Sequence, residues 1–123
     1  MELTLETLPY DLTVCKLEDV RDADPGMEFF FLARTDGEVS LVCRTEDVPP
    51  NAIVREDGWR GFRVRGPLDF SLIGILSKLA GILAENGVSI FAVSTYDTDY
   101  VLVRSESFAR AAQTLAEAGY RVV

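Results

Sequence analysis

Hydrophobic residues in the second half of the chain first alternate with polar ones and then recur at every third or fourth position. Residues 59–65 alternate, with Phe62 and Val64 on one side and Arg63 and Arg65 on the other, which predicts a β-strand. From Ser71 onward the apolar residues follow the helical period, and Asn86-Gly87 supplies a stop signal. The pattern therefore predicts a strand followed by an amphipathic helix.

The rest of this half repeats the scheme. Apolar runs at 88–95 and 100–104 predict two strands joined by a polar hairpin. Ser105 is a candidate cap for a second helix that ends at Gly119, and residues 120–123 predict a last strand. This order of elements is typical of the α+β ferredoxin-like βαββαβ fold, an antiparallel four-stranded sheet with both helices on one face.

The first half of the chain has no helical period of ten or more residues. Short apolar runs predict strands at 12–17, 29–33, 39–43 and 52–55. Asp36-Gly37 predicts a tight hairpin in which the glycine takes a positive φ, and Glu56–Gly58 predicts a loop. We therefore expect a β-rich domain over 1–58 and the ferredoxin-like domain over 59–123, with no flexible linker between them.

Composition limits the classes of partner. A hydrophobic content of 48% is normal for a packed protein, and no apolar run approaches the roughly 18 residues that cross a membrane. The acidic, alternating N-terminus is unlike a secretory signal. These features predict a cytoplasmic protein without a membrane partner.

The net charge is −8, and all of it lies in residues 1–60, which hold 14 acidic and six basic residues. Residues 61–123 hold six of each sign and are neutral. Nucleic acid binding requires a basic stripe, and the sequence contains none. We therefore expect no nucleic acid partner and interpret the acidic half as a solvated surface.

The chain contains no histidine and two cysteines, Cys15 and Cys43, each placed among Val and Leu. The usual zinc ligand sets and catalysis based on histidine are therefore excluded, and both cysteines are expected to be buried thiols. No phosphate-binding loop or dinucleotide fingerprint occurs. The sequence predicts no cofactor and no metal.

Two polar stretches follow strand ends and are candidate binding segments. The first comprises Asp69, Phe70, Ser71, Leu72, Ile73 and Gly74. Backbone N–H groups at a helix start attract a carboxylate, and a glycine in the first turn lets a ligand approach closely. Spacing alone favours a simpler interpretation, in which Asp69 caps the helix and Gly74 packs against a neighbouring element.

The second stretch comprises Thr95, Tyr96, Asp97, Thr98 and Asp99. Its two carboxylates suit a cation, an ammonium group or a guanidinium. Two oxygen ligands are too few for a calcium loop, and without a substrate cleft the carboxylate pair does not indicate a glycosidase. A solvated turn whose Asp and Thr side chains bond their own backbone remains the alternative.

Three tracts, at 69–76, 87–91 and 94–103, resemble the ACT domain family. The closest likeness is to small proteins related to the aspartokinase regulatory region and to CASTOR-type arginine sensors. The resemblance covers residues 60–123, and the first half is similar to the degenerate ACT-like repeat that precedes the domain in that group. It implies a regulatory module without catalytic activity that binds a free amino acid, usually as a dimer.

The resemblance also implies where the ligand lies, between the strand–helix loop at 69–74 and the hairpin at 95–99. Asp99 matches the acidic position that faces the side chain of the ligand in the arginine sensors, and Thr95 and Tyr96 match pocket positions. One departure is that many amino-acid-binding members have a glycine where this chain has Asp69-Phe70-Ser71.

We therefore expect a non-enzymatic amino acid sensor whose partners are its ligand, a second copy of the chain and a separate regulated enzyme. A dimerisation or protein-interaction module on the same fold, without a ligand, is the alternative. An acylphosphatase-like enzyme would need an arginine in the loop at 69–74, which has none.

Overall fold

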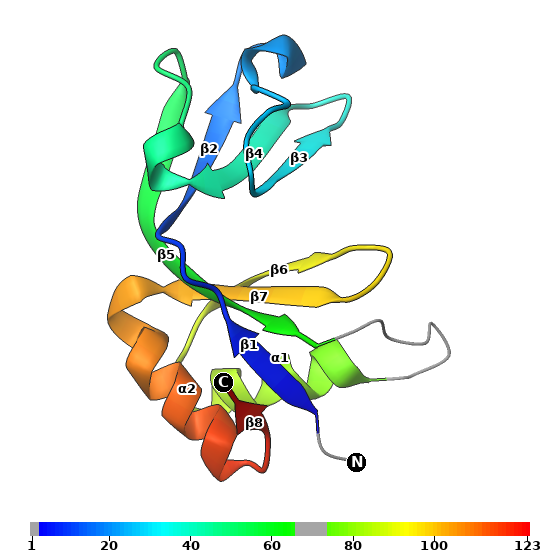
Figure 1. Cartoon of the computed structure of the whole chain (residues 1–123), viewed down its shortest axis with the longest axis vertical. Coiled ribbons are helices and arrows are strands. Elements are labelled where there is room, and N and C mark those ends of the chain that lie inside the picture. Colours follow the sequence, from blue (N-terminus) through cyan, green and yellow to red (C-terminus); the bar gives the residue numbers. More distant parts are fainter. Residues whose placement is uncertain (1–2, 66–73) are drawn as a thin grey trace. The chain divides into compact units, whose positions relative to one another are not determined.

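The computed structural model describes residues 3–65 and 74–123. Contacts divide the chain into two compact units, one formed by Met1–Pro9 and Arg60–Val123 and the other by Tyr10–Trp59. Strand β5 (Val54–Val64) contributes its first residues to the second unit and its last residues to the first. Figure 1 shows the order of the elements along the chain.

The larger unit has the predicted βαββαβ elements. They are β5, α1 (Ile75–Glu85), β6 (Ile90–Ser94), β7 (Asp99–Arg104), α2 (Phe108–Glu117) and β8 (Arg121–Val122). Strand β7 pairs with both β5 and β6, and its pairing with β6 is antiparallel. The α+β ferredoxin-like prediction is confirmed.

A fifth strand, β1 (Thr4–Thr7), which was not predicted from the sequence, separates β5 from β8 in this sheet. It pairs antiparallel with β5 and parallel with β8 (Figure 1). Leu5 points into the core and is 1% exposed, so the short alternating N-terminal segment is held by one buried leucine and by ladder bonds on both sides. The first strand thus belongs with the second half of the chain, which differs from the expected division at residue 58.

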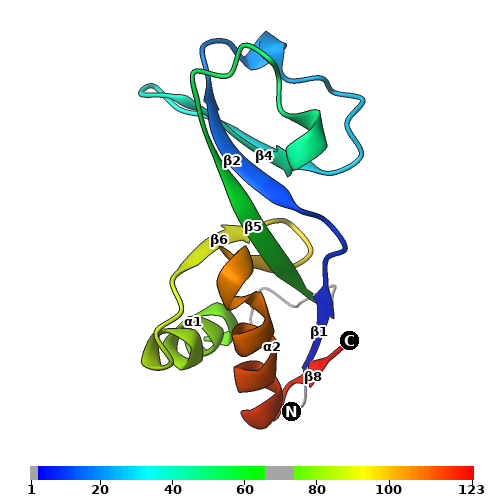
Figure 2. The ribbon, with the colours of Figure 1, turned by 90° about the vertical axis from the view of Figure 1, so that its left-hand side faces the viewer.

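Both α-helices cover one face of this sheet (Figure 2). The core between the layers joins strand and helix residues: Leu5, Phe62, Val64, Leu79, Leu83, Val88, Val101, Val103, Ala111 and Leu115. Burying apolar area at about 25 cal/mol per Å² is the main force that holds the helices on the sheet. Neither described α-helix has the length and the apolar run needed to cross a bilayer.

Glycines mark the helix ends of this unit. Gly87 and Gly119 follow α1 and α2 with φ of 74° and 104°, as the stop signals predicted. Gly74 also has a positive φ, 80°, and lies at the N-cap of α1. The prediction that put Gly74 inside the first helical turn was therefore wrong, because a left-handed residue cannot continue a right-handed helix. The cap predicted at Asp69 lies outside the described residues.

The smaller unit is β-rich. It contains β2 (Leu12–Leu17), β3 (Phe30–Arg34), β4 (Val39–Arg44) and the start of β5, paired in the order β3-β4-β2-β5. Two short 3-10 turns, η1 (Val20–Asp22) and η2 (Thr45–Asp47), take the places that α-helices have in the larger unit. η1 lies between β2 and β3, as α1 lies between β5 and β6, and η2 follows β4 at the position where α2 follows β7. Its core includes Cys15 and Cys43, both buried as predicted. Burial raises the pKa of the Cys43 thiol to about 12, so the thiol stays protonated and weakly reactive.

Glu56–Gly58 does not form the predicted loop. Strand β5 runs through it, and the register with β2 shifts from Leu12 opposite Trp59 to Val14 opposite Glu56. Gly58 has a φ of 88°, which lets the strand absorb the extra residue as a bulge. Because the glycine interrupts the hydrophobic alternation, the sequence alone suggested a break.

The turn between β3 and β4 closes without a left-handed glycine. Among the described residues a positive φ occurs at Gly58, Gly74, Gly87 and Gly119, so the conformation predicted for Gly37 was wrong. Thr35 donates its N–H to the Glu38 carbonyl at 2.9 Å, and its hydroxyl oxygen accepts from the N–H groups of Gly37 and Glu38 at 3.1 and 3.2 Å. The threonine supplies the acceptor that stabilises this turn.

The hairpins of the two units correspond residue by residue, 60 positions apart. β3 pairs Phe30 with Cys43, and β6 pairs Ile90 with Val103. Strands β4 and β7 have the same sequence of burial from their first to their last residue. The same short turn follows each of them, η2 after β4 and η3 (Ser105–Ser107) after β7.

Candidate functional site

The β6–β7 hairpin carries all five residues predicted in the second polar stretch. The N–H of Thr95 donates to the Thr98 carbonyl at 2.8 Å, and the Thr95 hydroxyl donates to the same oxygen at 3.0 Å. These bonds are the self-bonded turn that the simpler interpretation required of Thr95. Both donors of Thr95, its N–H and its hydroxyl, are therefore used in hydrogen bonds within the turn.

Thr98 is buried, at 7% exposure, and its hydroxyl donates a short hydrogen bond to the main-chain carbonyl of Val64. Val64 is the last residue of β5, so this bond ties the hairpin to the end of the strand that leads into residues 66–73. Thr98 acts as a structural anchor, and it fixes the position of the residues on either side of it.

Replacing Thr98 by valine is expected to destabilise the protein by about 1–3 kcal/mol, because the side chain keeps its shape while the buried Val64 carbonyl loses that donor. Urea unfolding, followed by circular dichroism, measures the change. Thr98→Ser keeps the hydroxyl and should therefore lower the free energy of unfolding much less. Equal losses in the two variants would mean that packing by the methyl group, and not the hydrogen bond, holds the hairpin.

The remaining hairpin residues face solvent to different degrees. Tyr96 is 82% exposed, Asp97 is exposed, and Asp99 is half-buried opposite Ser94. The arginines at the end of β5, Arg63 and Arg65, contact Glu6, at 3.2 and 3.7 Å. Asp97 and Asp99 thus present two negative charges at one end of the sheet.

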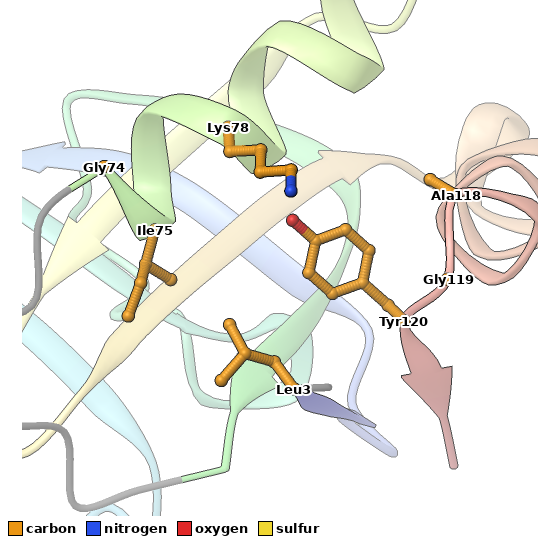
Figure 3. A pocket seen from close by; sticks show the side chains of 7 residues that line it. All are labelled: Leu3, Gly74, Ile75, Lys78, Ala118, Gly119 and Tyr120. Atoms are coloured by element: carbon orange, nitrogen blue, oxygen red, sulfur yellow. The ribbon is translucent and has the colours of Figure 1, made fainter. Parts of the chain in front are cut away.

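Of the first polar stretch, Gly74 lies in the described chain, and Asp69, Phe70, Ser71, Leu72 and Ile73 lie outside it. Gly74 borders a pocket of about 190 Å³ in the larger unit (Figure 3). The pocket is lined by Leu3, Gly74, Ile75, Lys78, Ala118, Gly119 and Tyr120. It opens between the start of α1, the end of α2 and the first residues of the chain, and none of the hairpin residues lines it.

Sequence reasoning missed the two polar residues of this pocket. Lys78 has an ordinary position on the exposed side of an amphipathic helix, and Tyr120 looked like the first residue of a strand. Burial raises the pKa of the Tyr120 hydroxyl, so this group is a hydrogen-bond donor at neutral pH. No sequence signal joins positions 78 and 120, because only the packing of α1 beside the α2–β8 turn brings them together.

Metal binding finds no support in the described chain. Across residues 3–65 and 74–123, no three His, Cys, Asp or Glu side chains are grouped so that they could hold an ion. The hairpin acids therefore remain candidates for an organic cation.

Comparison with known sequences identifies the family of the region that holds the hairpin and the α1 side of the pocket. The sequence model of the ACT domain family matches residues 54–117, from β5 through α2. The human protein named cytosolic arginine sensor for mTORC1 subunit 1 is 29% identical over 97 residues, which are 73% of this chain and 30% of the sensor. The rat protein of that name is 32% identical over 85 residues, or 63% of this chain and 26% of the sensor. The chain thus spans about 30% of the length of these curated relatives.

Solved structures extend the likeness to the whole chain. A crystal structure of a protein from Agobacterium tumefaciens has a TM-score of 0.87 and 33% identity, covering 100% of this chain and 93% of that one. The aspartate kinase of Clostridium acetobutylicum has a TM-score of 0.68 at 15% identity, covering 94% of this chain and 34% of the kinase. At that identity the kinase shares the fold.

Proposed function

The chain belongs to the ACT domain family, whose members are regulatory modules that bind amino acids, and from this premise we propose that it is a non-catalytic sensor of a free amino acid. The ligand would lie between the β6–β7 hairpin and the segment at 69–74. The observation that carries the proposal is the bond from Thr98 to the end of β5, because it holds the hairpin beside the strand that leads into that segment.

The chemistry of the hairpin favours a cationic group. Asp97 and Asp99 flank the buried Thr98, so the anchor that orients the turn also limits the positions of both carboxylates. Asp99 is the better candidate, because its half-buried position on β7 strengthens an ion pair relative to the exposed Asp97. Exposed Tyr96 would cover the ligand with its ring.

The segment 70–74 is proposed to hold the carboxylate of the ligand, because backbone N–H groups at a helix start attract a carboxylate. Asp69, Asp97 or Asp99 would meet its ammonium group or its side chain. Arginine is the first ligand to test, because the mammalian relatives are named arginine sensors and because a guanidinium suits paired acids. A second copy of the chain and a separate regulated protein are the proposed partners of the sensor.

A thermal-shift scan against the twenty amino acids tests the proposal. A ligand at about 100 times its dissociation constant adds roughly 2.7 kcal/mol of stability, which is a shift of several degrees for a domain of this size. We expect the shift for arginine or for one or two chemically related amino acids. A flat scan would contradict the sensor and favour the interaction module without a ligand.

Asp99→Asn is expected to weaken binding of that amino acid more than tenfold, because a hydrogen bond to a charged partner contributes about 1.5–3 kcal/mol. Isothermal titration calorimetry measures the affinity. Asp36→Asn is the matched control, since Asp36 is an exposed acid on the corresponding hairpin of the smaller unit. Unchanged affinity in Asp99→Asn would remove Asp99 from the site.

We also propose that the smaller unit is a reduced copy of the ACT fold. The matching hairpin registers and the following turns, 60 positions apart, support a duplication in which η1 and η2 stand for shortened helices. This proposal explains why the family model begins at β5 while the structural likeness covers the whole chain.

A further inference from the structure

We propose that the pocket between α1 and the α2–β8 turn is a second binding site, specific for a small monocarboxylate with a short hydrocarbon tail. The observation is a pair of polar side chains among the residues that line it. Lys78 of α1 and Tyr120, just before β8, point toward one another across the pocket (Figure 3). Gly74 borders both this pocket and the segment proposed to bind the amino acid, but none of the hairpin residues 95–99 lines the pocket.

Main-chain bonds hold both donors in place. The N–H of Lys78 donates to the Gly74 carbonyl at 2.8 Å in the first turn of α1. Tyr120 follows the left-handed Gly119, and its N–H donates to the Leu115 carbonyl at 3.1 Å. The N–H of Arg121 donates to the carbonyl of Leu3, just before β1, at 3.0 Å. These bonds fix the main-chain positions from which the two side chains extend over the pocket.

The two polar groups are both donors at neutral pH. Lys78 carries an ammonium group, and the raised pKa of Tyr120 keeps its hydroxyl protonated. The described residues that line the pocket include no acidic side chain to pair with Lys78. The protein as a whole has a net charge of −8, but the two polar side chains of this pocket are both hydrogen-bond donors. The pocket therefore favours an anion that can accept a hydrogen bond from each.

The remaining walls set the size and polarity of the ligand. Leu3, Ile75 and the ring of Tyr120 pack against the main core and supply the apolar part of a pocket surface that also has a large polar part. A volume of about 190 Å³ is below the roughly 300–1,000 Å³ typical of sites for drug-sized molecules. Space and surface therefore suit a carboxylate with a few carbon atoms.

The same walls disfavour an amino acid. Its carboxylate would accept from Lys78 and Tyr120, but its ammonium group would lose water without meeting an acid among the described lining residues. Leucine and 4-methylpentanoate share one carbon skeleton and differ by that ammonium group. They are therefore matched probes of the proposal.

Lysine acetylation reads out the site directly, because Lys16 and Lys78 are the two lysines of the chain and Lys16 is an exposed residue of β2. The rate at each lysine is measured by mass spectrometry at constant ionic strength. At twice its dissociation constant, 4-methylpentanoate leaves a third of the sites free and should slow acetylation of Lys78 about threefold, with Lys16 unchanged. Leucine at the same concentration should protect neither lysine.

Variants separate this site from the hairpin. Tyr120→Phe keeps the ring and should raise the dissociation constant of 4-methylpentanoate, measured from the protection of Lys78, roughly tenfold, whereas Tyr10→Phe, in the smaller unit, should not change it. Asp99→Asn should leave protection intact even if it abolishes amino acid binding. Lys78→Met should remove any thermal stabilisation by 4-methylpentanoate. Equal protection by leucine, equal slowing of both lysines, or no protection at all would overturn the proposal.

Discussion

Phe62→Ala is expected to destabilise the protein by about 3–5 kcal/mol, the largest effect of any single change considered. The side chain is 2% exposed in the core beneath the helices. Its ring stacks on Phe108, the first residue of α2, with centroids 4.9 Å apart and planes at 14°. Truncation leaves a cavity and removes the aromatic contact that holds the start of α2 on the sheet.

Urea unfolding followed at 222 nm measures this loss, because both described α-helices belong to the same unit. Phe62→Leu is the matched control, since it retains most of the apolar volume and should lose substantially less. A loss below about 1 kcal/mol in Phe62→Ala would show that the layer repacks and that α2 does not depend on this contact.

Gly61→Ala is the second large effect, with an expected loss of about 1–3 kcal/mol from overpacking. A β-carbon at this position would lie 2.4 Å from Leu102 Cδ2 and 3.2 Å from Leu8 Cδ1. Both leucines are at most 1% exposed, so neither has space to turn away. The glycine is needed because of this close approach, and its backbone does not have a positive φ.

Gly81→Ala is the control, because the same substitution is expected to raise the free energy of unfolding there and not to lower it. Gly81 lies within α1, and a β-carbon there would meet nothing within 4 Å. Alanine should stabilise the helix by roughly 0.5–1 kcal/mol, since it restricts the unfolded chain and favours the helix. The same urea experiment compares the two variants. Similar losses in both would contradict the packing argument at Gly61.

The two proposed sites, at the hairpin and at the pocket lined by Lys78 and Tyr120, differ in chemistry and would bind two kinds of metabolite. The hairpin offers carboxylates, and the pocket offers an ammonium group and a hydroxyl. Gly74, which borders the pocket, also ends the segment proposed to bind the amino acid. A ligand at either site would therefore contact the residues just before α1 or its first turn.

Local pattern alone determined most of the secondary structure of this protein. Strand β2 was predicted at its observed bounds, and the helices end at the predicted glycines, because side-chain period and glycine conformation act within a few residues. The hairpin at Thr95–Asp99 was also recognisable, since its polar residues follow an apolar strand. The family resemblance rests on these same local tracts, and the family match confirmed it.

Tertiary structure alone decided the features that depend on residues far apart in the chain. Insertion of β1 beside β5 and β8 joins the two ends of the chain, and the bulge at Gly58 is defined only by the partner strand. The anchor from Thr98 to Val64 and the meeting of Lys78 with Tyr120 likewise join separate elements. Such contacts cannot be predicted from hydrophobic periodicity, because that pattern reports the structure of one element at a time. Each of these contacts depends on how two separate elements pack together.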